Sequence, residues 1–453
     1  MFSEGAELFG QSIPELPSPL GQIAATISLF ERIPLGDRAT MLGLLYAMLD
    51  FVRDEETFEK YDRMSAHELF RTMGLSKRLI DDLVRPTLLV GLFKAPEELS
   101  AAVAMELLYF YALAHQTSFD VRWIKSRSIS ELIIAPLAKR LASRTLPDGQ
   151  PALTVMGGCA VSSLVLDPTS ASVSGLEFKR MGGVDPSAAA SSSLAGLSGV
   201  VLAVGAKGMR AIAAGSPALA KRAPELCAAA SLPSIDVIAC RLWLDIVVPT
   251  RTPANVLSRF DSLRGAGGTF FMLDQLQCDE LELLWGGSTP QGSCVACDFY
   301  NAGGLLPLDD EAIVELLLGE LLPAAVPGFA EARLVDSHVA RFPGAVSWFA
   351  PGSFSKRPPL QTSVPNLVCA GDWVRMGEHE HGAKGLCQER AYVSGIEAAN
   401  ALSRGTALGA AHKKQHAVIP IRDDEPQYVA ARAANKVVQD LLSPLGLDSP
   451  WVR

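Results

Sequence analysis

The sequence has few cysteines and no cysteine pattern. Only eight occur among 453 residues, scattered at positions 159, 227, 240, 278, 294, 297, 369 and 387. Secreted proteins that depend on disulfides carry a much higher cysteine density. The sequence therefore excludes a disulfide framework and indicates free thiols in a reducing compartment.

Long uninterrupted apolar runs are also absent. A membrane-spanning helix needs about 20 apolar residues in succession. Glu106 interrupts the nearest candidate, residues 99–114, which we expect to form a buried or groove-lining helix. Residues 1–10 contain Glu4 and Glu7 and match neither a secretion signal nor an Arg/Ser-rich transit peptide, so they are expected to belong to the middle of a domain.

The sequence contains no block of lysine and arginine, and its formal net charge is −9. Nucleic acid is therefore excluded as an expected partner. Apolar residues are abundant instead, at 49% against 20% charged residues. They suit a large core, an apolar substrate pocket or a face that touches a membrane. The length predicts two or three domains, or two interleaved ones.

Hydrophobic periodicity predicts helices in the first third of the chain. Residues 38–51 place apolar side chains at helical spacing. Ser65 followed by Glu68 predicts a capping box that opens another helix. Further helices are predicted over 76–88 and 96–115.

Strands dominate the middle of the chain. Residues 153–167 and 173–180 predict a β-hairpin, whereas the Ser/Ala-rich stretch 185–199 predicts a surface loop. Residues 199–204 predict a short buried strand. Four more strands are predicted over 236–247, 268–276, 292–300 and 333–346, with a helix over 309–322 and a terminal amphipathic stretch over 427–442. This order predicts an α/β, or mixed α+β, fold.

Residues 366–403 carry the clearest chemical pattern. A buried-type strand, 366–370, ends at Gly371 and Asp372, and a loop leads into a helix over 386–403. Glycine lets backbone approach a ligand closely. Asp372 can accept hydrogen bonds from ribityl or ribose hydroxyls, and the start of a helix favours an electron-rich oxygen such as the O2 edge of a flavin.

This segment resembles the closing motif of the flavin-containing amine oxidase and carotenoid desaturase superfamily. The matching residues are Ala370, Gly371, Asp372, Glu389, Ala391, Ser394 and Gly395. The resemblance implies FAD as cofactor, with Asp372 and its neighbour Trp373 at the ribityl–pyrophosphate portion. It also implies that the backbone of Gln388, Glu389 and Arg390 meets the flavin ring. Arg390 replaces a residue that is usually small.

The resemblance covers about residues 10–405. Residues 16–50 resemble the helical region of phytoene and zeta-carotene desaturases, and Val161 matches a valine that lies over the adenine. The superfamily's G-x-G-x-x-G motif does not occur in these 453 residues. The nearest glycine clusters, 205–208 and 265–268, have a different spacing, so the N-terminal dinucleotide-binding unit is expected to be absent.

The resemblance implies a partial FAD/NAD(P)-binding, Rossmann-like domain interleaved with a substrate domain of mixed sheet plus helices. The expected division is a mainly helical part of the substrate domain (1–150), a partial set of FAD-domain strands (151–215), the sheet and helices of the substrate domain (216–350), the C-terminal FAD-binding segment (351–405) and a surface tail (406–453).

Two further clusters allow more than one interpretation. The run 378–381, Glu-His-Glu-His, contains metal-ligand types but lacks accompanying ligands, so we expect a solvated or flavin-facing loop and no metal. Cys294 and Cys297 have the spacing of a redox pair. They lie in a predicted strand, however, where they would point to opposite faces, so structural thiols are expected. Four side chains are candidates for stabilising reduced flavin or relaying protons: Arg375, His379, His381 and Lys384.

The expected activity is that of an FAD-dependent oxidoreductase in which flavin accepts a hydride from an apolar isoprenoid or polyene, with an external electron acceptor. Aromatic residues of the predicted sheet, including Phe270, Phe271, Phe299 and Tyr300, are candidates for facing that substrate. Two alternatives are a non-catalytic relative that binds an apolar ligand and a flavin amine oxidase. The resemblance includes plastid enzymes and so implies a chloroplast location.

Overall fold

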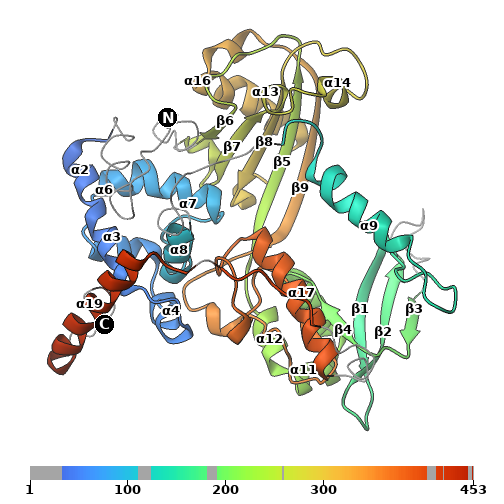
Figure 1. Ribbon diagram of the computed structural model, residues 1–453. Coiled ribbons are helices and arrows are strands. Elements are labelled where there is room, and N and C mark those ends of the chain that lie inside the picture. Colours follow the sequence, from blue (N-terminus) through green and yellow to red (C-terminus); the bar gives the residue numbers. More distant parts are fainter. Residues whose placement is uncertain are drawn as a thin grey trace.

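The chain has a mixed α/β fold, as its sequence predicts (Figure 1). The computed structural model describes residues 33–110, 124–180, 191–257, 260–405, 415–421, 423–446 and 451. Three sheets are present among them, together with helices. None of the described helices has the length and apolar character needed to cross a membrane. All eight cysteines are free thiols, as predicted.

Short helices form the N-terminal part of the described chain. They are α2 (Leu35–Ala39), α3 (Met41–Asp50), α4 (Glu55–Asp62), α5 (Ala66–Thr72), α6 (Lys77–Leu79), the π-helical η1 (Ile80–Val84), α7 (Arg85–Gly91) and α8 (Ala101–Leu108). The side chain of Ser65 accepts a hydrogen bond from the Glu68 N–H, which confirms the predicted helix start. The helix predicted from residue 96 begins only at Ala101, because residues 96–98 form a turn. Residues 111–115 of that prediction lie outside the described chain.

An antiparallel sheet contains the predicted hairpin. Strand β1 (Cys159–Leu166) pairs with β2 (Val173–Arg180), which in turn pairs with β3 (Ser191–Ala195). Asp167 closes the hairpin turn by accepting hydrogen bonds from the N–H groups of Thr169 and Ser170. The prediction of a loop over 185–199 is wrong for Ser191–Ala195, which forms β3. The backbone groups of this serine-rich segment form hydrogen bonds with β2. Residues 181–190 are outside the described chain.

The largest sheet has five antiparallel strands in the order β6–β7–β8–β5–β9. They are β5 (Ser234–Leu244), β6 (Ala254–Leu257), β7 (Gly267–Met272), β8 (Cys294–Tyr300) and β9 (Leu334–Ser347), with α13 (Leu273–Leu276) and α14 (Leu281–Leu284) between β7 and β8. Helices α15 (Asp310–Leu316) and α16 (Leu322–Ala325), joined by the π-helical η7 (Leu317–Leu321), cover one face. Phe270 and Phe299 lie in that covered core, so they do not face a substrate, whereas strand alternation places Phe271 and Tyr300 on the opposite face.

Two parallel strands form the third sheet. Strand β4 (Val200–Leu202) pairs with β10 (Leu367–Cys369), although 164 residues separate them in sequence. Helix α10 (Ala206–Gly215) follows β4, and α17 (Gln388–Gly405) follows β10. Helices α11 (Pro217–Arg222) and α12 (Pro224–Ala230) lie after α10. Because parallel strands end at the same edge, the starts of α10 and α17 gather there.

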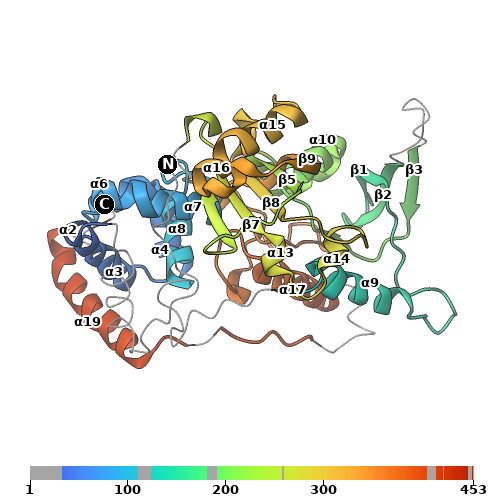
Figure 2. The same ribbon diagram turned by 90° about the horizontal axis from the view of Figure 1, so that it is seen from above.

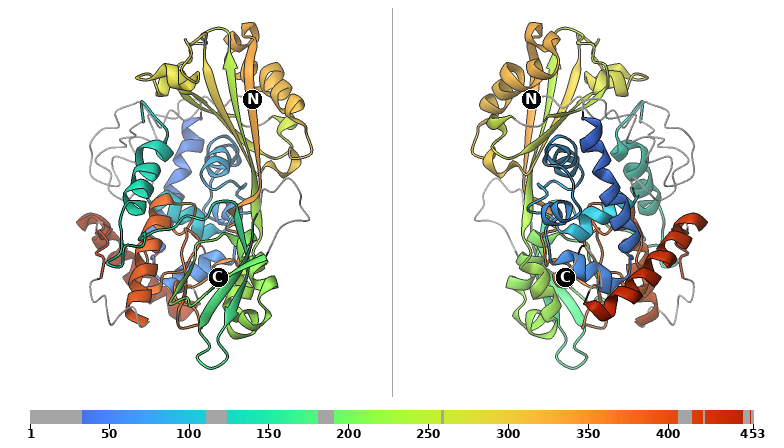
Figure 3. Two further views of the ribbon diagram at one scale, coloured as in Figure 1. Left: turned by 90° about the vertical axis from the view of Figure 1, so that its right-hand side faces the viewer. Right: turned by 90° about the vertical axis from the view of Figure 1, so that its left-hand side faces the viewer.

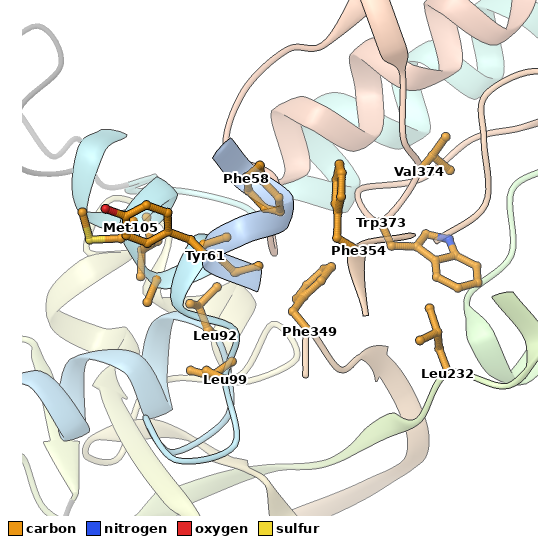
Figure 4. Packing of buried hydrophobic residues seen from close by; sticks show 14 of the residues in the cluster. Phe58, Tyr61, Leu92, Leu99, Met105, Leu232, Phe349, Phe354, Trp373 and Val374 are labelled. Carbon is orange, nitrogen blue, oxygen red and sulfur yellow. The ribbon is translucent and has the colours of Figure 1, made fainter. Parts of the chain in front are cut away.

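One large core joins these parts. It runs from the N-terminal helices to the β10 region, where the rings of Phe58 and Phe354 lie 4.4 Å apart (Figure 4). Helix α19 (Pro426–Leu442), predicted as an amphipathic stretch, packs on α3 through a hydrogen bond from Tyr46 to Asn435. Helix α9 (Ala135–Ala142) and the π-helical η3 (Ser130–Ile134) before it have no buried residue. Figure 2 shows α9 at the periphery of the molecule.

A buried ion group fastens the helical region to the loop before α17. The carboxylate of Glu106 is fully buried and accepts hydrogen bonds from Arg53 Nε at 3.1 Å and Lys384 Nζ at 3.2 Å. The backbone N–H of Lys384 also reaches this carboxylate, at 3.3 Å. A single acid therefore compensates two cations, one of them almost completely buried.

We predict that Glu106→Gln lowers the free energy of unfolding by about 3–5 kcal/mol, because it leaves the almost completely buried ammonium group of Lys384 uncompensated. Urea unfolding followed by circular dichroism measures the change. Glu97→Gln is the matched control: Glu97 pairs with Arg85 but is 42% exposed, so its loss should cost about 1 kcal/mol or less. Equal effects of the two substitutions would contradict this account of the buried group.

Candidate functional site

The turn after β10 depends on a glycine. Gly371 has φ +137°, a conformation that residues with a side chain rarely adopt. A Cβ atom at this position would lie 3.1 Å from the indole of Trp373. The N–H of Gly371 donates to Ser394 Oγ in α17 at 2.8 Å. The turn is therefore fixed directly to the helix that follows it.

Asp372 directs its carboxyl group at the beginning of α17. The carboxylate accepts a hydrogen bond from the backbone N–H of Cys387, the residue before the helix. Burial raises the pKa of this carboxyl above its ordinary value, and the positive charges of Arg390 and Arg357 offset part of the rise. A carboxylate has about four acceptor positions, so Asp372 can still accept hydrogen bonds from ligand hydroxyls.

Arg390 holds the loop after this turn against α17. Its guanidinium is fully buried. Nε donates to the Asp372 carbonyl at 2.8 Å, while Nη1 donates to Glu380 Oε2 at 2.6 Å and to the His381 carbonyl at 3.0 Å. Nη2 donates to the carbonyl of Val374. The side chain thus shapes the backbone from 372 to 381, a role that the sequence pattern did not indicate.

The four proton-relay candidates are all engaged in ion pairs or close charge contacts. Arg375 pairs with Glu55 at 3.3 Å, and Lys384 belongs to the Glu106 group. His379 Nδ1 lies 3.6 Å from Glu397 Oε2. His381 Nε2 lies 3.1 Å from Glu389 Oε1 at the start of α17. The described residues contain no group of three or more His, Cys, Asp or Glu side chains placed to hold a metal ion.

The remaining predicted cofactor residues occupy different surroundings. Gln388 and Glu389 open α17, with Glu389 exposed, and Trp373 is buried in the main core (Figure 4). Val161 lies on β1, in another sheet, with 39% of its surface exposed. The structure therefore brings Gly371, Asp372 and the start of α17 together, while Val161 is held by a separate element.

Arg357 is a buried residue that was not among the candidates predicted from the sequence. Its Nη1 donates to the Lys384 carbonyl at 2.8 Å, and its guanidinium lies 4.4 Å from the ring centre of Phe349. Burial lowers the pKa of Arg357 to about 10, although Asp62 acts in the opposite direction. Nε and Nη2 have no hydrogen-bond partner within the described chain. Buried donors of this kind are usually satisfied by water or by a ligand.

Comparisons with known proteins give structural matches only. No protein-family model and no curated protein sequence matches the chain. An oxidoreductase from Methanosarcina mazei is similar at 13% identity and a TM-score of 0.49, over 83% of this chain and 74% of that one. Cyclohexylamine oxidase from Brevibacterium oxydans is similar at 14% identity and a TM-score of 0.45, over 83% of this chain and 76% of that one. Putrescine oxidase bound to putrescine is similar at 12% identity and a TM-score of 0.47, over 82% of this chain and 77% of that one.

We predict that Asp372→Asn changes how stability depends on pH. The folded-state pKa of Asp372 lies above the ordinary value of 3.8. Between these two values the folded chain holds a proton that the unfolded chain has lost, so wild-type stability falls as the pH rises through this window. The asparagine variant should lack this fall in stability. Urea unfolding of both proteins, at pH values between the two pKa values, measures the free energy of unfolding. Parallel curves for the two proteins would refute the assignment.

Proposed function

We propose that the chain is an FAD-dependent oxidoreductase whose flavin accepts a hydride from an apolar isoprenoid or polyene and is reoxidised by an external acceptor. The observation that carries the proposal is the junction of β10, the Gly371–Asp372 turn and α17. Ligands of open α/β sheets bind at the carboxyl ends of parallel strands. Both β4 and β10 end at this edge, and each leads into a helix.

The residues at this junction fit the ribityl and ring portions of a flavin. Gly371 leaves its backbone uncovered by a side chain, and Asp372 keeps acceptor positions for hydroxyl groups. The first backbone N–H groups of α17, at Gln388 and Glu389, have no partner within the helix and would stabilise negative charge at a ring oxygen. When bound, the flavin supplies the hydride-accepting chemistry.

Other residues position this junction. Arg390 and Ser394 hold the turn against α17, and Trp373 packs beside Gly371. Four side chains are candidates for stabilising the negative charge of reduced flavin. Of these, His381 contacts the first turn of α17, through Glu389. We therefore assign it that role ahead of Arg375, His379 and Lys384. Val161 is proposed to contact the adenine, by resemblance.

An apolar substrate suits the face of the five-stranded sheet that α15 and α16 leave uncovered. Tyr300 on that face stacks with Phe93 at a centroid distance of 4.2 Å. Tyr300 pairs with Gly267, and Phe271 lies four residues further along the same strand, on the same face. The apolar composition favours a lipid-like molecule drawn from a membrane surface, and the resemblance suggests a plastid. Nucleic acid is not an expected partner.

An amine is the second candidate substrate. Asp298 lies on the same face of the sheet as Tyr300, opposite Thr269 and Ala239. Burial raises the pKa of Asp298, and Arg241 offsets part of that rise. A carboxylate in this position could pair with an ammonium group. Flavin reduction by polyamines under anaerobic conditions, lost in Asp298→Asn, would favour this candidate over a polyene.

We predict that the chain binds riboflavin, which contains the ring and ribityl groups without the pyrophosphate. Asp372→Ala should weaken binding roughly 10–100-fold, because a hydrogen bond to a charged group contributes about 1.5–3 kcal/mol. Fluorescence quenching of riboflavin measures the affinity. Asp440→Ala, at an exposed position on α19, is the control and should leave binding unchanged. A wild-type chain that fails to bind riboflavin would overturn the proposed site.

A further inference from the structure

Four polar side chains are buried together where α4, the start of α8 and the 3-10 helix η9 (Phe354–Lys356) meet. They are Asp62, Ser100, Ser353 and Arg357, and each has a relative exposure of 3% or less. The N-terminal helices and the C-terminal segment lie side by side in this part of the molecule and share one core (Figure 3). Polar groups in such a place need hydrogen-bond partners, because burial without one costs free energy.

Backbone hydrogen bonds hold this cluster together. The Phe354 N–H donates to Asp62 Oδ2 at 2.8 Å, and the Arg357 N–H donates to the Phe354 carbonyl at 3.0 Å. The Ser100 N–H donates to the Phe349 carbonyl at 2.9 Å. The end of α4 and the start of α8 are therefore both fixed to the segment 349–357.

Several polar atoms of the cluster have no hydrogen-bond partner within the described chain. They are Asp62 Oδ1, Ser100 Oγ, Ser353 Oγ, and Nε and Nη2 of Arg357. Ser100 immediately precedes α8, yet its side chain accepts no hydrogen bond from that helix. Its hydroxyl offsets part of the rise that burial causes in the pKa of Asp62, so the two groups are near each other.

Arg357 and Asp62 attract each other without a direct hydrogen bond. The charge of each group shifts the pKa of the other toward the ionised form. Nevertheless, the Asp62 carboxylate accepts no hydrogen bond from the guanidinium, whose Nη1 donates to the Lys384 carbonyl at 2.8 Å. Two hydrogen bonds in succession through one small molecule join atoms that lie about 4.5–5.5 Å apart. Such a molecule would supply the missing partners of both charged groups.

Aromatic rings around the guanidinium limit the size of this molecule. The Arg357 Cζ atom lies 4.4 Å from the ring centre of Phe349, 5.3 Å from that of Phe354 and 5.9 Å from that of Phe58. All three rings are at most 1% exposed, and Figure 4 shows them beside one another in the core. Close-packed interiors hold few ligands larger than water. A ligand of this cluster therefore has to be very small.

The charges that act on Arg357 disfavour an ion as the ligand. The carboxylates of Asp62, Glu380 and Asp372 raise the pKa of Arg357, whereas Arg390 lowers it. An anion would be repelled by these carboxylates, and a cation would face the donors of the guanidinium. The ligand must accept a hydrogen bond from Arg357 and donate one to Asp62. Water is the smallest uncharged molecule that does both.

We propose that an internal water molecule bridges the Arg357 guanidinium and the Asp62 carboxylate. The hydroxyls of Ser100 and Ser353 are its further partners, which gives the water the usual two to four hydrogen bonds of a buried site. Through Arg357 the water connects the end of α4 to the Lys384 carbonyl in the loop before α17. The inference does not depend on the proposed flavin site.

A crystal structure of the full chain, at a resolution that locates ordered water, tests the proposal. We expect one density peak within about 2.7–3.2 Å of both Asp62 Oδ1 and a guanidinium nitrogen of Arg357. A direct contact between the two side chains, with no density between them, would overturn the proposal. Crystals soaked in bromide provide the second arm. Anomalous density at the same place would identify an anion site and would also overturn it.

Variants of Asp62 extend the test. Asp62→Asn keeps an acceptor oxygen, so the density peak should persist. Asp62→Leu should remove the peak and raise the equilibrium constant for unfolding at least about 100-fold, because it leaves a buried guanidinium uncompensated. Adding Arg357→Met should reverse most of that rise, because apolar side chains need no bridging water. Asp440→Leu, at an exposed position on α19, is the matched control and should change the constant by no more than about twofold.

Two results with these variants would contradict the proposal. One is a density peak that persists at Arg357 in Asp62→Leu, because the carboxylate would then not hold the water. The other is a peak that Asp62→Asn abolishes, because the amide oxygen still accepts a hydrogen bond. The asparagine structure decides the question where Asp62→Leu does not fold.

Discussion

The guanidinium of Arg390 sets the geometry on which the rest of the site depends. It is buried and donates to backbone carbonyls of Asp372, Val374 and His381 as well as to Glu380. An arginine has a rigid, planar set of donors, so these contacts fix the loop in one arrangement. As a result, Gly371 keeps its left-handed conformation beside α17 and Asp372 faces the start of that helix.

Charges elsewhere in the core support the same loop. Glu106 binds Lys384, and Arg357 donates to the Lys384 carbonyl, so the segment before α17 is held from the helical region and from within the C-terminal segment. Burying a charged group without a partner is costly. The loop therefore cannot move far from these partners without leaving buried charges uncompensated. This organisation supports a preformed ligand site, in which little ordering is needed on binding.

The sequence predicted the helix caps, turns and amphipathic helices that depend on interactions between residues close together in the chain. The Ser65 cap, the hairpin turn at Asp167 and the amphipathic helix at 426–442 depend on residues that are close in sequence, and the structure contains all three. The serine-rich strand β3 was missed because its pairing with β2, rather than its composition, makes it a strand. The role of Arg390 and the bond from Glu106 to Lys384, 278 residues apart, depend on tertiary contacts that periodicity does not encode.

A crystal structure of the chain soaked with riboflavin would locate the flavin ring and so test the proposed site at Asp372 and α17. We expect density for the isoalloxazine at the first turn of α17, with a ribityl hydroxyl within hydrogen-bond distance of the Asp372 carboxylate. Density bound to another part of the chain, with no ligand hydroxyl within hydrogen-bond distance of the Asp372 carboxylate, would contradict this expectation.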